Sequence, residues 1–159
     1  MKRGQLDQPF VIIFALVVAS VILILGYYSI SGLIKTAGSV ETAKFYGDLK
    51  KNVEIYYNYA PGTNALIKLS VPDDINGVCF VELNTVDESD IKYKGVAEDV
   101  GAFKKTADYN VFFSIKENIK PVSPLRIEKL KPKENPTCKD TLGRLDLVLT
   151  NKGSYVEVS

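Results

Sequence analysis

The sequence predicts an α+β protein, in which a long N-terminal transmembrane helix leads to an amphipathic helix packed on a small antiparallel β-sheet head. The prediction depends on an uncharged apolar run near the N-terminus, a four-residue apolar periodicity after it, and short strand-like segments in the remainder. The 159 residues suffice for one domain with an appendage. We divide the chain into a short basic cytoplasmic leader (1–8), a transmembrane helix (9–34), an amphipathic helix or stalk (35–60) and an extracellular β-rich domain (61–159).

The apolar run is the first element. No Asp, Glu, Lys or Arg occurs from Gln8 to Ile34, and Phe10 to Tyr28 would extend about 28 Å as a helix, close to the ~30 Å hydrocarbon core of a bilayer. A helix of a soluble domain is usually apolar on one stripe only. We therefore expect a membrane anchor, formed by Phe10, Val11, Ile12, Ile13, Phe14, Leu16, Val17, Val18, Val21, Ile22, Leu23, Ile24 and Leu25.

The flanks of the run predict its orientation. Lys2 and Arg3 precede it, and basic residues favour the cytoplasmic side. We expect a single-pass protein of the cell membrane, with a cytoplasmic N-terminus and an extracellular C-terminal domain. The alternative is a secretory signal cleaved after the small residues Ser29 and Ser31. The apolar run is longer than the 7–15 residues typical of such signals, which favours a retained anchor.

A second helix is expected at about 39–59. Phe45, Leu49, Val53 and Tyr57 recur at four-residue steps, and charged side chains occupy most of the other positions. This pattern predicts a helix with one buried face. One option is that the helix continues from the membrane segment, with Gly32 and Gly38 as points where it could bend or break. The segment 60–64 (APGTN) ends it.

The rest of the chain is predicted to form mostly strands. Alternating or continuous apolar segments predict strands, and an Asn/Gly-containing loop between the last two predicts a hairpin. The expected strands are Ala65–Val71, Gly77–Leu83, Val111–Ile115, Leu125–Leu130, Arg144–Thr150 and Ser154–Val158, with a hairpin loop at 151–153 and a short helix near Val96–Ala107.

The two cysteines, Cys79 and Cys138, both lie in the part expected outside the cell. An oxidising compartment favours one disulfide between them, worth about 4 kcal/mol in the loop-entropy model. The alternative is two unpaired thiols, since Cys79 lies in an apolar segment that would bury it in either case.

Composition disfavours several functions. The formal net charge of +1 argues against nucleic acid as a partner. The absence of His removes the usual participant in zinc sites and in serine or cysteine triads. We therefore expect no enzyme activity, cofactor, metal or small-molecule substrate. Acidic residues cluster at 73–90 and basic residues at 116–144, which could guide subunit contacts or simply decorate the surface.

The N-terminal residues carry a family resemblance. Lys2-Arg3-Gly4-Gln5, directly before a long apolar helix, resembles the start of archaeal type IV pilin-like precursors, surface proteins with a class III signal peptide. The resemblance implies removal of the leader between Gly4 and Gln5 by a prepilin peptidase. It also implies an apolar helix that serves as a membrane anchor and then as a filament core, with a β-rich head outside. The sequence departs from the family at Pro9, where pilins commonly carry Glu.

Two functional hypotheses follow. The first is a non-enzymatic, single-span surface protein of pilin-like design with a structural or assembly role. The second is a permanently anchored extracellular domain that binds a partner and forms no filament. The expected partners are the lipid bilayer and either further copies of the chain or other membrane and surface proteins.

Overall fold

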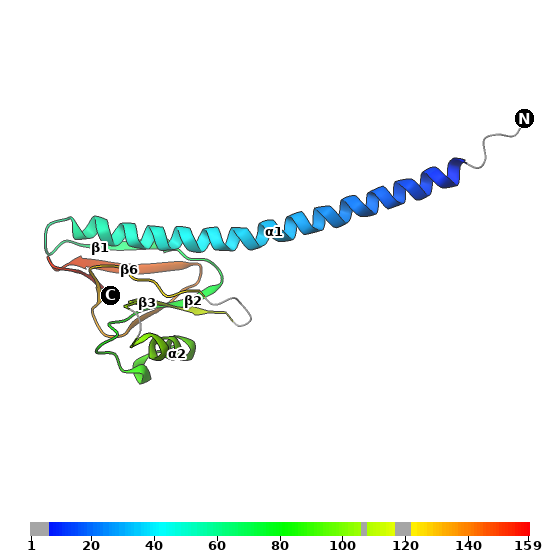
Figure 1. Cartoon of the computed structure of the whole chain (residues 1–159). Helices are drawn as coiled ribbons and strands as arrows, with labels where there is room; N and C mark the ends of the chain where they lie inside the picture. Colours follow the sequence, from blue (N-terminus) through cyan, green and yellow to red (C-terminus); the bar gives the residue numbers. More distant parts are fainter. Residues whose placement is uncertain (1–6, 106–107, 117–121) are drawn as a thin grey trace, which may run out of the picture. The chain divides into compact units, whose positions relative to one another are not determined.

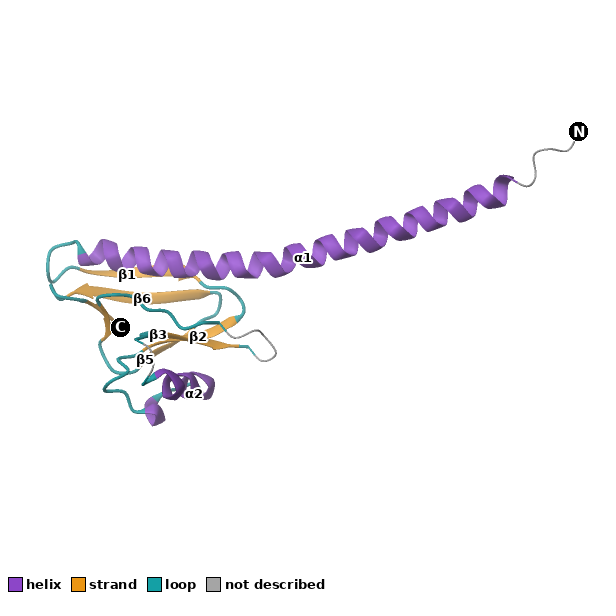
Figure 2. Ribbon diagram, viewed as in Figure 1, coloured by secondary structure: helices purple, strands orange, loops and turns teal. Residues whose placement is uncertain are grey.

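The computed structural model describes the backbone of residues 7–105, 108–116 and 122–159, and the side chains of these residues except 7–11 and 27–39. The fold is mixed α+β, as the sequence predicts (Figures 1 and 2). Its elements are α1 (Asp7–Tyr57), β1 (Asn64–Ser70), β2 (Ile75–Phe80), the short 3₁₀ helix η1 (Glu88–Asp90), α2 (Lys94–Phe103), β3 (Val111–Ile115), β4 (Leu130–Pro132), β5 (Thr137–Asp140), β6 (Arg144–Asn151) and β7 (Val156–Val158). The chain divides into two compact units, Met1–Val40 and Glu41–Ser159. We call the second unit the head.

The described strands of the head form two sheets, whereas the sequence predicted one. The first sheet has the order β1-β6-β7-β4 and the second the order β3-β2-β5. All described strand pairs are antiparallel except β4 with β7, which are parallel. The division could not be seen in the sequence because strand patterns indicate which face is buried, but not which distant strand lies alongside.

Burial patterns explain why these segments are strands. In β6, Leu145, Leu147 and Leu149 are buried and alternate with more exposed residues, so one face of the first sheet meets the core. In β2, Val78 and Phe80 belong to one core cluster and Cys79 to another. Both faces of β2 are therefore covered, which accounts for the continuous apolar run in the sequence.

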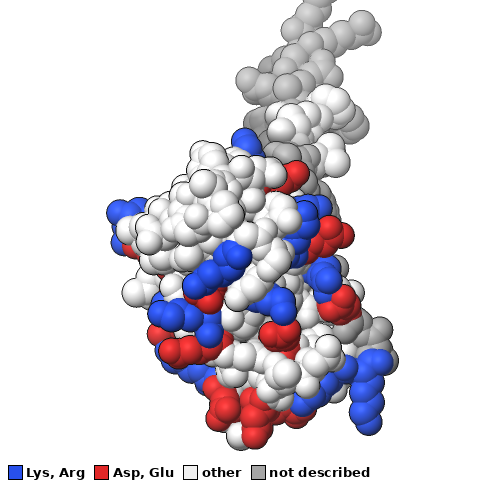
Figure 3. Space-filling model, turned by 90° about the vertical axis from the view of Figure 1, so that its left-hand side faces the viewer, with Lys and Arg blue, Asp and Glu red and all other residues white. Residues whose placement is uncertain are grey.

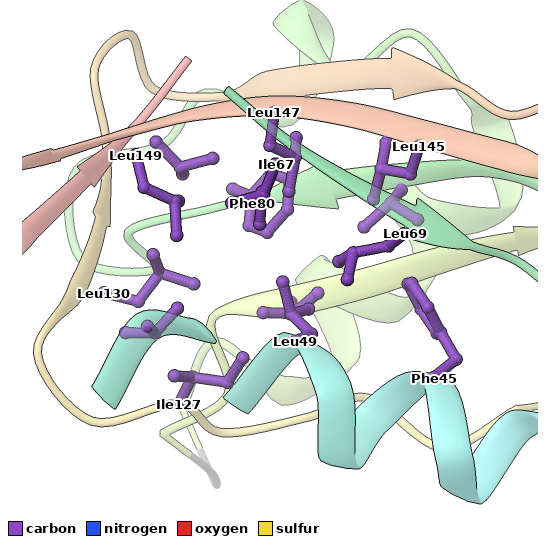
Figure 4. Packing of buried hydrophobic residues seen from close by; sticks show 14 of the residues in the cluster. Phe45, Leu49, Ile67, Leu69, Phe80, Ile127, Leu130, Leu145, Leu147 and Leu149 are labelled. Carbon is purple, nitrogen blue, oxygen red and sulfur yellow. The ribbon is translucent and has the colours of Figure 1, made fainter. Parts of the chain in front are cut away.

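The part of α1 that belongs to the head, Glu41–Tyr57, is called its head segment. The main core lies between this segment and the two sheets. Phe45, Leu49 and Val53 of α1 are almost fully buried, as their four-residue spacing predicts. Figure 4 shows Phe45 and Leu49 directed at apolar side chains of the sheets. The strand residues that share this cluster include Ile67, Leu69, Val78, Phe80, Val111, Phe113, Leu145, Leu147, Leu149, Val156 and Val158.

A second, smaller core lies beneath the other face of the β3-β2-β5 sheet. Val96 and Val100, one turn apart on α2, are fully buried and pack with Cys79, Val81 and Phe112. The helix begins two residues before the predicted Val96. The predicted end at Ala107 lies outside the described residues.

The strand predicted at Leu125–Leu130 is wrong. Leu125 makes only an isolated bridge with Val111, and β4 begins at Leu130. The backbone of Ile127 is instead held by the Asn110 side chain: its N–H donates to Asn110 Oδ1 at 2.8 Å, and its carbonyl accepts from Nδ2 at 2.7 Å. A side chain thus replaces the strand neighbour that the sequence pattern suggested.

The C-terminal hairpin forms, but its loop is one residue later and longer than predicted. Asn151 is the last residue of β6 and pairs with Val156, so the loop comprises residues 152–155. Gly153 has a φ of +88°, a left-handed conformation that glycine adopts without a side-chain clash.

The described part of the chain contains no helix with the length and apolar character required to cross a membrane. The transmembrane helix at 9–34 therefore stays a prediction from the sequence. The backbone of α1 is helical from Asp7 to Tyr57, with no break at Gly32 or Gly38.

Candidate functional site

The predicted anchor residues with described side chains are all exposed. Their exposed fractions run from 39% at Val18 to 73% at Leu23. The complete set is Ile12, Ile13, Phe14, Leu16, Val17, Val18, Val21, Ile22, Leu23, Ile24 and Leu25. The side chains of Phe10 and Val11, and the predicted processing site at Gly4 and Gln5, lie outside the described residues.

This exposure is unusual because the residues are aliphatic on every side of the helix. Exposed apolar patches larger than a few hundred Å² mark interaction surfaces in soluble proteins. Between Ile12 and Leu25, which we call the apolar segment, the one hydroxyl is satisfied locally, since Ser20 Oγ donates to the carbonyl of Leu16 at 2.7 Å. The segment therefore presents an apolar surface with no unsatisfied side-chain donor among its described residues.

The head has a disulfide between Cys79 and Cys138, as the sequence predicts. The two residues lie directly opposite each other on β2 and β5. The bond joins strands that are 59 residues apart in the sequence, and Cys79 is fully buried in the smaller core. It restricts the unfolded chain and so stabilises the sheet that supports α2.

Asn151 connects the end of α1 to the first sheet, a role that sequence reasoning missed. Its Nδ2 lies within hydrogen-bond distance of the carbonyls of Tyr56, Tyr57 and Tyr59, at 2.8–3.0 Å. Its Oδ1 accepts from the N–H of Gly153. Because the last carbonyls of a helix have no partner within the helix, this buried amide supplies a C-terminal cap. The Asn-Lys-Gly sequence signalled a turn but not this contact.

Asn135 has a similar role in the smaller half of the head. Its Oδ1 accepts from the N–H of Glu82 at 2.8 Å, and its Nδ2 donates to the Glu82 carbonyl and to Thr85 Oγ1. The amide therefore holds the segment that follows β2 against the loop before β5. These contacts connect the end of β2 with the loop that leads into β5.

The acidic and basic segments of the sequence are partly paired within the head itself. Glu82 from the acidic segment pairs with Lys131 from the basic one at 3.0 Å, and Glu88 pairs with Lys104 at 3.8 Å. Figure 3 shows charges of both signs spread over the face in view, with acidic side chains gathered toward the lower end. These pairs are exposed and contribute little to stability.

Five carboxyl and phenol groups of the described head have shifted pKa values, and burial raises that of the Tyr46 phenol. Hydrogen bonds from the backbone and side chain of Ser89 lower the pKa of Asp87. Hydrogen bonds from Lys92 and Tyr93 lower the pKa of the Asp140 carboxyl. Burial, with a smaller effect of the neighbouring Glu98, raises the pKa of Asp99.

Burial is the main cause that raises the pKa of Tyr93, whose hydroxyl donates to Asp140 Oδ1 at 2.5 Å. The Tyr93 ring also lies over Gly77, where a Cβ would come within 2.3 Å of it. The Lys92–Asp140–Tyr93 group is therefore a solvent-exposed polar contact between the segment before α2 and the end of β5.

A groove of the described head has a volume of about 440 Å³ and lies between α1 and the segment 126–129. Val53 and Ile127 line it together with Lys50, Tyr57 and Lys129. Lys129 has a φ of +61°, which is uncommon for a residue with a side chain, and its ammonium lies 3.7 Å from the centre of the Tyr57 ring. The groove could hold a small polar group.

No set of three or more His, Cys, Asp or Glu residues within the described ranges is placed to hold a metal ion. Comparison with protein-family models, curated proteins and solved structures gave no match to this chain. The candidate functional surface is the exposed apolar segment of α1, because its described large side chains are uncovered.

Proposed function

We propose that this chain is a non-enzymatic, single-span surface protein of pilin-like design, anchored in the membrane by its apolar segment and carrying its head outside the cell. The observation that supports the proposal most is the apolar segment, in which every described large side chain is exposed. Such a surface needs lipid or other apolar helices to cover it. The buried residues of the head, by contrast, cover one another in its two core clusters.

The disulfide is consistent with an extracellular head, since disulfides persist mainly in oxidising compartments. The uncharged segment supplies the anchor, and Lys2 and Arg3 orient it with the N-terminus in the cytoplasm. In a filament the same aliphatic side chains would pack between copies, so that anchoring and self-association use one surface.

The intact mass of the protein purified from its native membrane tests the pilin-like design. A chain that begins at Gln5 indicates leader removal, and Gly4→Leu should then leave the full-length mass. Gly26→Leu is the matched control, because a side chain at Gly26 meets no atom within 4 Å and lies far from the expected cleavage site. A chain that retains Lys2 and Arg3 would contradict leader processing.

The second candidate is a permanently anchored extracellular binding domain. The groove between α1 and the segment 126–129 favours it, because the groove has the size of a small-molecule site and its rim carries a constrained lysine, Lys129. Full-length mass, with no filaments seen by electron microscopy of sheared cells, would support this candidate over the first.

A further inference from the structure

One apolar side chain of the head is displayed to solvent in an unusual way. Leu142 lies in the turn between β5 and β6 and is 98% exposed. Scattered surface leucines are common, but most are partly covered by neighbours. Leu66, on the outer face of β1, is 59% exposed by comparison.

The turn that carries Leu142 is held firmly on both sides. Before it, Thr141 is buried, its N–H donates to the Asn76 carbonyl at 2.8 Å, and its hydroxyl donates to the Ile75 carbonyl. After it, the Gly143 carbonyl accepts from the N–H of Val71 at 3.0 Å. Gly143 has a φ of +73°, which allows the chain to reverse here. The backbone therefore holds the Leu142 side chain outward.

The turn lies at the end of the head where the chain enters it. Gly143 lines a hollow of about 390 Å³ together with Glu41 and Lys44, which belong to the first turns of the head. Ile34, the last residue of the uncharged segment, precedes Glu41 by seven residues. Seven residues span about 25 Å even when fully extended. In a chain anchored through the apolar segment, the connection therefore keeps Glu41 within about 25 Å of Ile34.

The charges around Leu142 suit a lipid surface without a large net charge. Asp140 pairs with Lys92 and Arg144 with Asp146, while Lys139 has no ion pair among the described residues. Glu41, Asp48 and Asp73 line the neighbouring hollow together with Lys44. Basic and acidic groups thus nearly balance, which disfavours selective binding of anionic lipid and permits contact with zwitterionic headgroups.

We propose that Leu142 inserts into the headgroup–acyl boundary of the bilayer that anchors the chain, and so fixes the tilt of the head on the membrane. This inference rests on the proposed membrane anchor. Apolar side chains of peripheral elements occupy this boundary, about 5–10 Å into the headgroup region. A turn with a fixed backbone favours insertion, because the Leu142 side chain can enter the lipid without further loss of backbone conformational entropy.

The chain contains no Trp, so a single introduced tryptophan reports its own environment. We would reconstitute the full chain with Leu142→Trp in phosphatidylcholine vesicles, with and without lipids brominated near the headgroup. The expected result is a blue-shifted emission and loss of most of the fluorescence when brominated lipid is present. Unchanged thermal unfolding of the variant shows that the head is intact.

Two matched variants separate the possible outcomes. Leu66→Trp, on the outer face of the first sheet, should keep its fluorescence. Phe14→Trp, in the apolar segment, should be quenched by lipid brominated along the acyl chain. Quenching at position 14 without quenching at position 142 would contradict the insertion of Leu142 but support the membrane anchor. An absence of quenching at position 14 would contradict the membrane anchor itself. A blue shift at 142 that grows with protein density, without lipid quenching, would replace the lipid contact by a contact with a second copy.

Discussion

Two stretches of α1 are both rich in aliphatic and aromatic residues, yet they differ in what covers them. In the head segment, Phe45, Leu49 and Val53 are at most 2% exposed. In the upstream segment, the described large side chains from Ile12 to Leu25 are 39–73% exposed. The head residues stand four apart with charged residues between them, while no charged residue separates the upstream residues.

The difference shows that the arrangement of apolar residues, more than their number, indicates the partner. A stripe of three side chains matches one sheet face, and the charged positions beside it remain in water. An uninterrupted run has no polar face to leave in water, so a single small domain cannot cover it. The upstream segment therefore requires a surrounding that is apolar on all sides, which is the basis of the membrane-anchor proposal.

The largest expected effect comes from placing charged residues in the upstream segment (Ile12–Leu25), which tests whether it is a membrane anchor. Val18→Lys combined with Ile22→Lys, one turn apart near the middle of the run, should oppose membrane insertion by about 6 kcal/mol. We expect the variant to leave the membrane fraction on alkaline carbonate washing, with the melting temperature of the head in detergent unchanged. Leu66→Lys on the outer face of β1 is the control and should stay membrane-bound. Retention of the double variant would contradict the anchor.

In the head segment, truncation of the buried stripe should reduce stability instead. Leu49→Ala removes a fully buried side chain from the main core and should lower the free energy of unfolding by about 3 kcal/mol. Ile55→Ala, on the same helix but 37% exposed, should cost less than about 1 kcal/mol. Chemical denaturation in detergent measures both. Equal losses would mean that the stripe does not define the core.

Local patterns were sufficient to predict much of the fold. Burial within a short segment can be predicted from that segment alone. Examples are the apolar stripe at 45–57, the alternation of Leu145, Leu147 and Leu149, and the apolar run at 77–83. The Cys79–Cys138 disulfide was predicted because only two cysteines were present and the compartment was inferred from the apolar run.

The missed features depend on contacts between distant residues. The separation into two sheets and the parallel pairing of β4 with β7 are set by strands far apart in the sequence. Asn110 and Asn151 act through side-chain hydrogen bonds to distant backbone groups, and asparagine in a sequence signals only a turn. The exposure of Leu142 was likewise invisible, because it depends on how Thr141 and Gly143 are held.

Asn151 offers a smaller test, at the point where α1 ends. Asn151→Ala removes the cap from the carbonyls of Tyr56, Tyr57 and Tyr59 and should cost about 2 kcal/mol of stability. Asn52→Ala is the control, because the Asn52 amide donates only to the carbonyl four residues before it on an exposed face. Hydrogen exchange should show faster opening of the last turn of α1 in the first variant and not in the second.

Lowering the pH should affect the stability of the head but not the membrane association of the apolar segment, and this is the smallest effect that we expect. Asp87 and Asp140 have lowered pKa values in the folded head, so the stability they contribute is complete above the ordinary carboxyl pKa of 3.8 and is lost as the pH falls through their folded values. Asp99, whose pKa is raised, acts in the opposite direction and partly offsets this loss. The segment from Gln8 to Ile34 has no Asp, Glu, Lys, Arg or His, so its membrane association should not change over the same pH range.

Thermal unfolding of the head between pH 6 and pH 2.5, beside carbonate-resistant association measured after equilibration at each pH, tests both expectations together. Asp140→Asn should flatten the acid limb of the unfolding curve because its carboxylate no longer takes up a proton, while Asp99→Asn should steepen it. An association that weakens in step with head unfolding would mean that the head itself holds the protein on the membrane. That outcome would reverse the assignment of anchoring to the apolar segment, since the stretch from Gln8 to Ile34 contains no side chain that titrates in this range.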